Sequence, residues 1–228
     1  VAQHVLYDAS EDTIGSSFGG VRQVLRDLRT LPPELRPLLV GDTLVRFANG
    51  MVYVFFVIVV TEFLAVGVRL PVVGRLSPDA SFGVLLAIEM LVALLIMLPV
   101  SRLSRRIGLR PVVALGFSVY AVFPVLLINA PESAGVLALL FALSGLRFAG
   151  LPAHKALIVG PAEAGTGGRV TGAYYLVRNV VVIPSAAVGG AIYAVSPVTA
   201  FSVATGVGLV GLALFVVFGR EFEAAVAG

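Results

Sequence analysis

The sequence predicts an all-α, polytopic membrane protein with six transmembrane helices. Of its 228 residues, 58% are hydrophobic and only 13% are charged, whereas a soluble domain carries roughly 25% charged residues. The mean hydropathy is +1.01. The apolar residues also gather into six blocks, and these reach or approach the roughly 20 residues that a membrane-spanning helix needs.

The first part of the chain, residues 1–37, is polar and is expected to be a cytoplasmic linker. Within it, residues 21–31 alternate apolar side chains with arginines at helical spacing, which predicts a short basic amphipathic helix. Such a helix suits an anionic membrane surface, and it is equally typical of a solvated linker. Because the chain starts at Val1 and not at Met, we expect it to be a fragment of a longer protein.

A transmembrane domain is expected over residues 38–219, followed by a cytoplasmic tail over residues 220–228. Its apolar blocks cover approximately residues 38–66, 81–101, 110–129, 134–158, 170–194 and 197–219. Prolines lie within or near three of the later blocks, where they are expected to kink the helices: Pro124, Pro152 and Pro184. Small residues at a spacing of four, such as Ala186 and Gly190, are candidates for close helix contacts.

The basic residues between the blocks predict the orientation. Most of them fall on the side that holds both termini, and the opposite side holds only Arg69 and Arg75. Lysine and arginine are retained in the cytoplasm, so we expect both termini there and the protein in the plasma membrane. Basic residues distributed in this way orient helices, and we expect no nucleic-acid partner.

Polar residues recur along the first block. Asp42, Arg46, Asn49 and Tyr53 follow the spacing i, i+4, i+7 and i+11, which places them on one helix face. We expect Asn49 and Tyr53 to line a substrate path. Asp42 and Arg46 allow two interpretations, either part of the same polar stripe or an intrahelical ion pair that anchors the helix or closes a gate.

Glu89 lies well inside the second block. An isolated carboxylate at that depth is a candidate proton carrier, and it is equally well explained as the partner of an arginine on a neighbouring helix. Asp42 and His154 are further candidates for proton or ion coupling.

Arginines also lie inside the fourth and fifth blocks. Arg147 is central in its block, and Arg178 follows Tyr175 within the next one. All three are candidates for the substrate path. The two arginines could bind an anionic substrate, or they could pair with Glu89 and Asp42.

The sequence patterns that resemble enzyme motifs do not indicate an enzyme. The chain has no cysteine, and it contains no HExxH or Walker A motif, so we expect no enzyme activity, no cofactor and no metal. Residues 206–211 match GxGxxG but lie inside the last apolar block, where helix packing explains glycine better. Ser144 lies in a motif that resembles the serine motif of rhomboid proteases, yet His154 is roughly 15 Å along the same helix.

The segment from Ser101 to Arg110 carries the clearest motif. It resembles the G-x-L-(A/S)-D-R-x-G-R-R loop of the major facilitator superfamily. The matching residues are Leu103, Ser104, Arg106, Gly108 and Arg110, and the departures are Ser101, Arg105 and Leu109. The resemblance implies a cytoplasmic gate loop that includes Ser101, Arg102, Arg105, Arg106, Gly108 and Arg110.

The resemblance extends over most of the chain, through residues 145–147, 152–156 and 172–178. It implies the C-terminal half of a twelve-helix secondary active transporter that works by alternating access, coupled to protons or ions. The partners implied are an N-terminal six-helix half, membrane lipids and a small-molecule substrate. The alternative is a non-transporting scaffold or receptor-like protein on the same fold.

Overall fold

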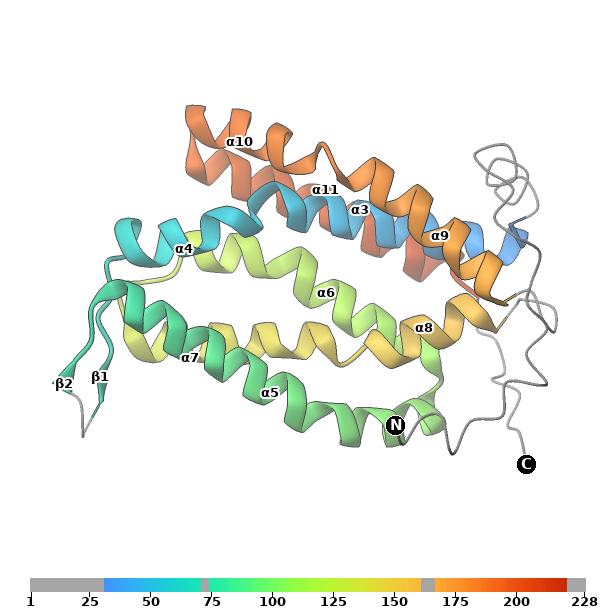
Figure 1. Cartoon of the computed structure of the whole chain (residues 1–228), viewed down its shortest axis with the longest axis horizontal. Coiled ribbons are helices and arrows are strands. Elements are labelled where there is room, and N and C mark those ends of the chain that lie inside the picture. The colour runs from blue at the N-terminus through green and yellow to red at the C-terminus, as the bar shows by residue number, and fades with distance from the viewer. Residues whose placement is uncertain (1–30, 71–73, 161–166, 221–228) are drawn as a thin grey trace, which may run out of the picture.

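The computed structural model describes residues 31–70, 74–160 and 167–220, and these are almost wholly helical (Figure 1). The predicted helix over residues 21–31 lies outside the described residues, apart from its last position. Within the described part, six helical segments are long and apolar enough to cross a membrane: Pro33–Phe63, Pro78–Ile107, Leu109–Ile128, Ala134–Val159, Gly168–Val195 and Pro197–Phe218. The predicted fold class, an all-α membrane protein with six spans, is confirmed.

The first span changes its helical geometry along its length. A 3₁₀ turn, Pro33–Leu35, leads into α3 (Arg36–Val52). A second 3₁₀ turn, Tyr53–Phe55, is followed by α4 (Phe56–Ile58) and by a π-helical turn, Val59–Phe63. Because the number of residues per turn changes at Tyr53, the regular helix face that begins at Asp42 ends there.

A short hairpin and a one-residue connection frame the second span. Strands β1 (Arg69–Leu70) and β2 (Gly74–Arg75) pair antiparallel ahead of α5 (Pro78–Ile107). Ser77 caps α5 by accepting a hydrogen bond from the Ala80 amide. At the other end Gly108 has a φ of 90°, which glycine adopts readily, and α6 (Leu109–Ile128) begins at the next residue.

One sequence expectation about this region is wrong. The residues expected to form the first part of a gate loop, Ser101 to Arg106, are the last turns of α5. The helix continues beyond the apolar block because neither glycine nor proline interrupts it between Val100 and Gly108. Arginine side chains at such a helix end can extend towards water, so helical structure costs little there.

The fourth and fifth spans are each interrupted. The fourth consists of α7 (Ala134–Gly145), a 3₁₀ turn (Leu146–Phe148) and α8 (Leu151–Val159). The fifth consists of α9 (Gly167–Val182) and α10 (Ser185–Val195). Pro152 lies in the first turn of α8 and Pro184 lies at the start of α10, so the breaks occur where the prolines predict kinks. The last span is α11 (Pro197–Phe218).

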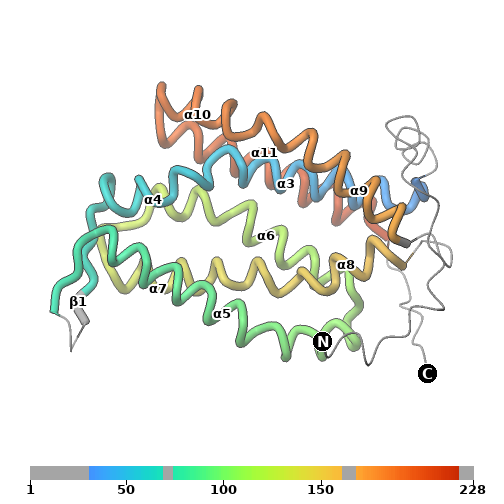
Figure 2. Tube along the Cα trace, viewed as in Figure 1, coloured from blue at the N-terminus to red at the C-terminus, as the bar shows by residue number. Residues whose placement is uncertain are grey.

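The helices lie side by side along the long axis of the molecule (Figures 1 and 2). α11 packs most extensively on α3 and α6, and α5 packs on α7. The α6 span is 61% buried, the largest share of any span in the described part. One apolar core contains Phe56, Phe123 and Phe201, and a second contains Phe117 and Phe215.

Glycines allow several helices to approach closely. A Cβ atom on Gly208 would lie 2.9 Å from the Cα atom of Ala121, and one on Gly211 would lie 2.8 Å from the carbonyl oxygen of Gly41. These glycines of the GxGxxG pattern therefore serve helix packing, as the sequence indicated. A Cβ on Gly189 would overlap the carbonyl group of Met51, which joins α10 tightly to α3.

Large apolar side chains cover much of the outer surface. On α5, Leu91, Leu94, Leu95 and Leu98 are between 56% and 71% exposed. Water would not favour such a continuous apolar surface, and lipid would. The chain is therefore an integral membrane protein.

Candidate functional site

The most heavily charged cluster surrounds Asp42, whose side chain on α3 is fully buried. One carboxylate oxygen, Oδ1, is 3.2 Å from Nε of Arg46. The other, Oδ2, is 3.1 Å from an Arg178 guanidinium nitrogen, 3.2 Å from Nε2 of His154 and 3.1 Å from the hydroxyl of Tyr174. Three spans thus bring basic or hydroxyl groups to one carboxylate.

Membrane energetics explain this convergence. A charged side chain at the centre of a span costs about 2.5–3.5 kcal/mol unless it has a partner or water. Asp42 satisfies two arginines from different helices, Arg46 and Arg178, and they in turn offset its own charge. The ion pair between Asp42 and Arg46, which the spacing suggested, is present. Arg178 pairs with the same carboxylate, which is one of the two alternatives that the sequence left open.

A second cluster lies around Glu89 on α5. Its Oε1 atom is 2.5 Å from a terminal guanidinium nitrogen of Arg147, and it accepts a hydrogen bond of 2.8 Å from the hydroxyl of Ser144. The side chains of Arg147 and Glu89 are only 6% and 2% exposed. Arg147 therefore also pairs with a carboxylate, the second of the two alternatives that the sequence left open. Ser144 donates to a carboxylate and is not bonded to a histidine, which gives no support to a protease site.

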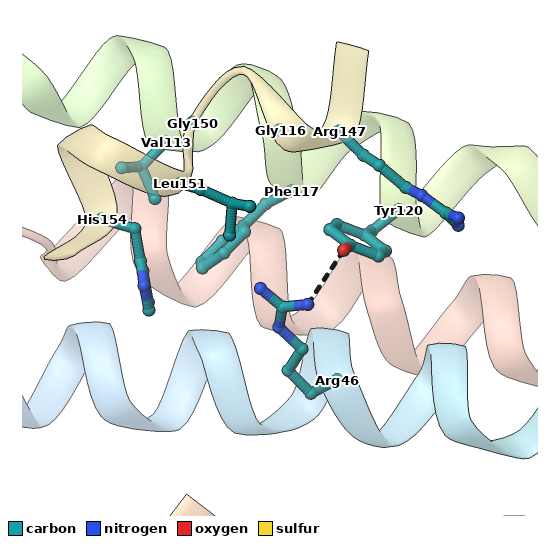
Figure 3. Close-up of a pocket in the computed structure, with 9 residues that line it drawn as sticks. All are labelled: Arg46, Val113, Gly116, Phe117, Tyr120, Arg147, Gly150, Leu151 and His154. Carbon is teal, nitrogen blue, oxygen red and sulfur yellow. Dashed lines mark hydrogen bonds between the residues drawn. The ribbon is translucent and has the colours of Figure 1, made fainter. Parts of the chain in front are cut away.

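Tyr120 on α6 lies between the two clusters. Its hydroxyl accepts a 2.9 Å hydrogen bond from Arg46, and Figure 3 shows this bond as well as the position of Tyr120 between the two arginines. The guanidinium carbons of Arg46 and Arg147 lie 4.7 and 5.2 Å from the centre of its ring. Both distances fit cation–π contacts. One tyrosine thus touches both ion-pair clusters.

An open pocket borders the Asp42 cluster. Its volume is about 460 Å³, and it is lined by side chains of α3, α8 and α9: Arg46, Leu151, His154, Lys155, Tyr175, Arg178 and Asn179. A smaller cavity of about 10 Å³ lies next to it (Figure 3), between α3, α6 and the fourth span. Arg147, Leu151 and His154, all from the fourth span, line this small cavity.

Other predicted site residues lie further from this pocket. Asn49 is half-buried, and Tyr53 is 52% exposed, with the guanidinium carbon of Arg147 6.0 Å from its ring centre. Neither residue lines the 460 Å³ pocket. Their role in a substrate path stays a prediction.

The residues assigned to the gate lie at one end of the bundle. Ser101, Arg102, Arg105 and Arg106 are exposed on the last turns of α5. Arg110, at the start of α6, donates a hydrogen bond to the carbonyl oxygen of Val216 on α11. This contact joins two helix ends, and the gating role of the segment stays a prediction.

No known family model matches the chain, and no curated protein matches it closely. In the described part of the chain, no group of three or more His, Asp or Glu residues is arranged to hold a metal ion. The arrangement suits reversible ion pairing and the binding of a charged solute.

Sequence reasoning missed several members of the site. Lys155 and Asn179 line the pocket, and Tyr120 bonds to Arg46, one of its charged residues. Tyr174, which bonds to Asp42, was indicated by the sequence, because it precedes Arg178 by one helical turn. Tyr120 carries no such signal, since it is uncharged and stands among apolar residues of α6, where tyrosine is common.

Proposed function

We propose that this chain is one six-helix half of a secondary active transporter of the major facilitator type, which moves a small molecule across the membrane by alternating access. The observation that carries the proposal is the open pocket of about 460 Å³ where ionisable side chains from the first, fourth and fifth spans converge. Ionisable groups inside membrane spans are typical of solute and ion pathways. Uptake and efflux both fit.

The proposed setting is the plasma membrane, with both termini in the cytoplasm. The basic residues that support this orientation include Arg102, Arg105 and Arg106 at one end of the bundle. A second six-helix half would be the principal partner, and lipid would cover the exposed leucines of α5. The motif between Ser101 and Arg110 and the six-span layout support the major facilitator type of transporter.

The charged clusters suggest how coupling would work. Asp42 pairs with Arg46 and Arg178, and Glu89 pairs with Arg147. If either carboxylate took up a proton or a cation, the arginines paired with it would lose their counter-charge and would need a new partner. His154, at 3.2 Å from Asp42, is placed to share that change. Asp42, Glu89 and His154 are accordingly the proposed coupling residues.

A second candidate function is a non-transporting membrane scaffold or receptor-like protein on the same fold. One observation favours it, because Arg147 is buried against Glu89 and does not face an open path. A scaffold would hold its charges in such fixed pairs. The open, basic pocket beside Asp42 is not needed by a scaffold, and it is the reason for preferring a transporter.

Thiol accessibility tests the proposal. The complete gene product is made with a single cysteine at Leu151 or Asn179, both in the pocket wall. These 228 residues contain no cysteine, and any cysteine outside them is replaced first. A membrane-impermeant maleimide is applied to right-side-out and to inverted vesicles. In a transporter the pocket faces each side in turn, so both cysteines should react in both kinds of vesicle.

The control is Leu94→Cys on the lipid-covered surface of α5, where the side chain is 66% exposed in the isolated chain. Lipid suppresses thiolate formation, so this cysteine should react in neither preparation. If the pocket cysteines react from one side only, alternating access is excluded and the scaffold interpretation prevails.

A further inference from the structure

The pocket between α3, α8 and α9 has more basic than acidic groups around it. Arg46, Lys155 and Arg178 line it, together with His154. The carboxylate beside them is Asp42, which is already shared between both arginines and His154. Positive charge is therefore in excess in this pocket, and charged groups inside membrane spans need a counter-charge or water.

Two of the basic groups are available to a ligand. Lys155 is exposed and has no ion pair within the described ranges. Arg178 gives one terminal nitrogen to Asp42, while its Nε and other terminal nitrogen donate to the side-chain oxygen of Asn179, at 3.2 and 2.9 Å. These two nitrogens form the edge of the guanidinium whose fork geometry suits a carboxylate or a phosphate. An oxyanion would accept hydrogen bonds from this edge more strongly than the neutral amide of Asn179 does.

The remaining wall suits an organic group. The ring of Tyr175 stacks under Arg178, with 4.6 Å between the guanidinium carbon and the ring centre. Leu151 adds an apolar surface. A volume of about 460 Å³ lies within the usual range of sites for small organic molecules. The pocket therefore combines an oxyanion site with an apolar and aromatic wall.

We propose that this pocket binds a small organic oxyanion, a carboxylate or phosphate carried on an apolar or aromatic body, through Lys155 and Arg178. This deepens the proposed function, because it makes the transported solute an organic anion. Binding itself does not depend on transport, so the two claims can fail separately.

Titration with matched probes tests the anion site. The purified chain in phosphatidylcholine nanodiscs is titrated by calorimetry with benzoate and phenyl phosphate, and with benzamide and benzylammonium as neutral and cationic counterparts. The two anions should bind roughly tenfold or more tightly than the two counterparts, because only they pair with both basic groups. Equal binding of benzoate and benzamide, or no binding of either anion, would overturn the proposal.

A charge-matched pair of variants places the site. Lys155→Gln should weaken both anions about tenfold, since it removes one charge-assisted contact. Arg75→Gln removes the same charge from an exposed position on β2, outside the pocket, and should leave binding unchanged. An equal effect of the two substitutions would show general electrostatic attraction in place of a site and would overturn the proposal.

An anionic lipid headgroup has the same phosphate chemistry, so the source must be distinguished. Titrations are repeated in nanodiscs with added phosphatidylglycerol. Unchanged affinity for benzoate supports a solute site, whereas loss of benzoate binding assigns the pocket to lipid and overturns the proposal. If the anions do not bind while the pocket cysteines still react from both sides, the anion site fails and the transporter stands. If the anions bind but the pocket cysteines react from one side only, the anion site stands and the transporter proposal fails.

Discussion

At the scale of single residues, the ion pairs decide which charges this bundle tolerates. Arg147 and Glu89 are both almost fully buried, and each supplies the counter-charge that the other requires. The pair is worth little as a net stabiliser, because both groups lose their hydration. It becomes important when one partner is removed, since a single charge is then left in an apolar interior.

We predict that Glu89→Gln lowers the free energy of unfolding by about 3–5 kcal/mol, the usual cost of breaking a buried ion pair from one side. Glutamine keeps a hydrogen-bond acceptor for Ser144 but leaves Arg147 without a counter-charge. Denaturant titration of the purified chain in detergent measures the change. The double variant Glu89→Gln with Arg147→Gln should recover much of the loss, because no lone charge remains.

The control is Glu62→Gln, which neutralises an exposed carboxylate in the π-helical turn. It should change stability by less than about 0.5 kcal/mol. Additive losses in the double variant would mean that Arg147 and Glu89 do not depend on each other, and the interpretation of the pair would be wrong.

The sequence predicted some of these ion-pair partners, because a charged residue inside a span needs a counter-charge, a substrate or water. Arg147 and Arg178 lie inside apolar blocks, so each had to find water, a substrate or a carboxylate, and Glu89 and Asp42 were the carboxylates at hand. Tyr120 could not be predicted in the same way. A tyrosine is uncharged and can be accommodated in many environments. Only the packing of α6 shows that the ring of Tyr120 contacts two arginines.

At the scale of helices, close approach depends on where glycine meets a neighbour. The sequence offered Ala186 and Gly190 as a small-residue pair, but the tight contact in α10 is made by Gly189 against Met51 of α3. Spacing alone identifies a small-residue helix. Which face of that helix meets a neighbour depends on its rotation in the bundle, and this rotation is a property of the whole fold.

We predict that Gly189→Leu separates α10 from α3 and destabilises the chain, because even a Cβ atom overlaps the Met51 carbonyl group. The cost should be several times that of Gly206→Leu in α11, where a Cβ atom meets nothing within 4 Å. Thermal unfolding in detergent, followed by circular dichroism, measures both. Equal melting temperatures for the two variants would contradict the close packing of α10 on α3.

At the scale of the whole molecule, composition sufficed for the fold class but not for the site. A long apolar block must become a spanning helix, because lipid offers no partner for unpaired backbone groups. That argument gives six spans without knowledge of any contact. It gives no information on how spans are rotated, so the joining of the first, fourth and fifth spans at one pocket was visible only in the structure.

We predict that the two ends of the bundle lie on opposite sides of the membrane, with the Arg-rich end of α5 inside the cell. Arg105→Cys and Glu132→Cys are both exposed single-cysteine positions, at the end of α5 and between α6 and α7. In intact cells an impermeant maleimide should label the cysteine at position 132. It should reach the one at position 105 only after permeabilisation, and the reverse pattern would invert the proposed orientation.

The connection between α5 and α6 is the single residue Gly108. Neighbouring Cα atoms are held about 3.8 Å apart by the peptide bond, so these two helix ends are tethered and cannot part. Any tilt of α5 must drag the start of α6 with it, and through the hydrogen bond from Arg110 it must also pull on the end of α11. Motion at this end of the bundle is therefore shared by three helices.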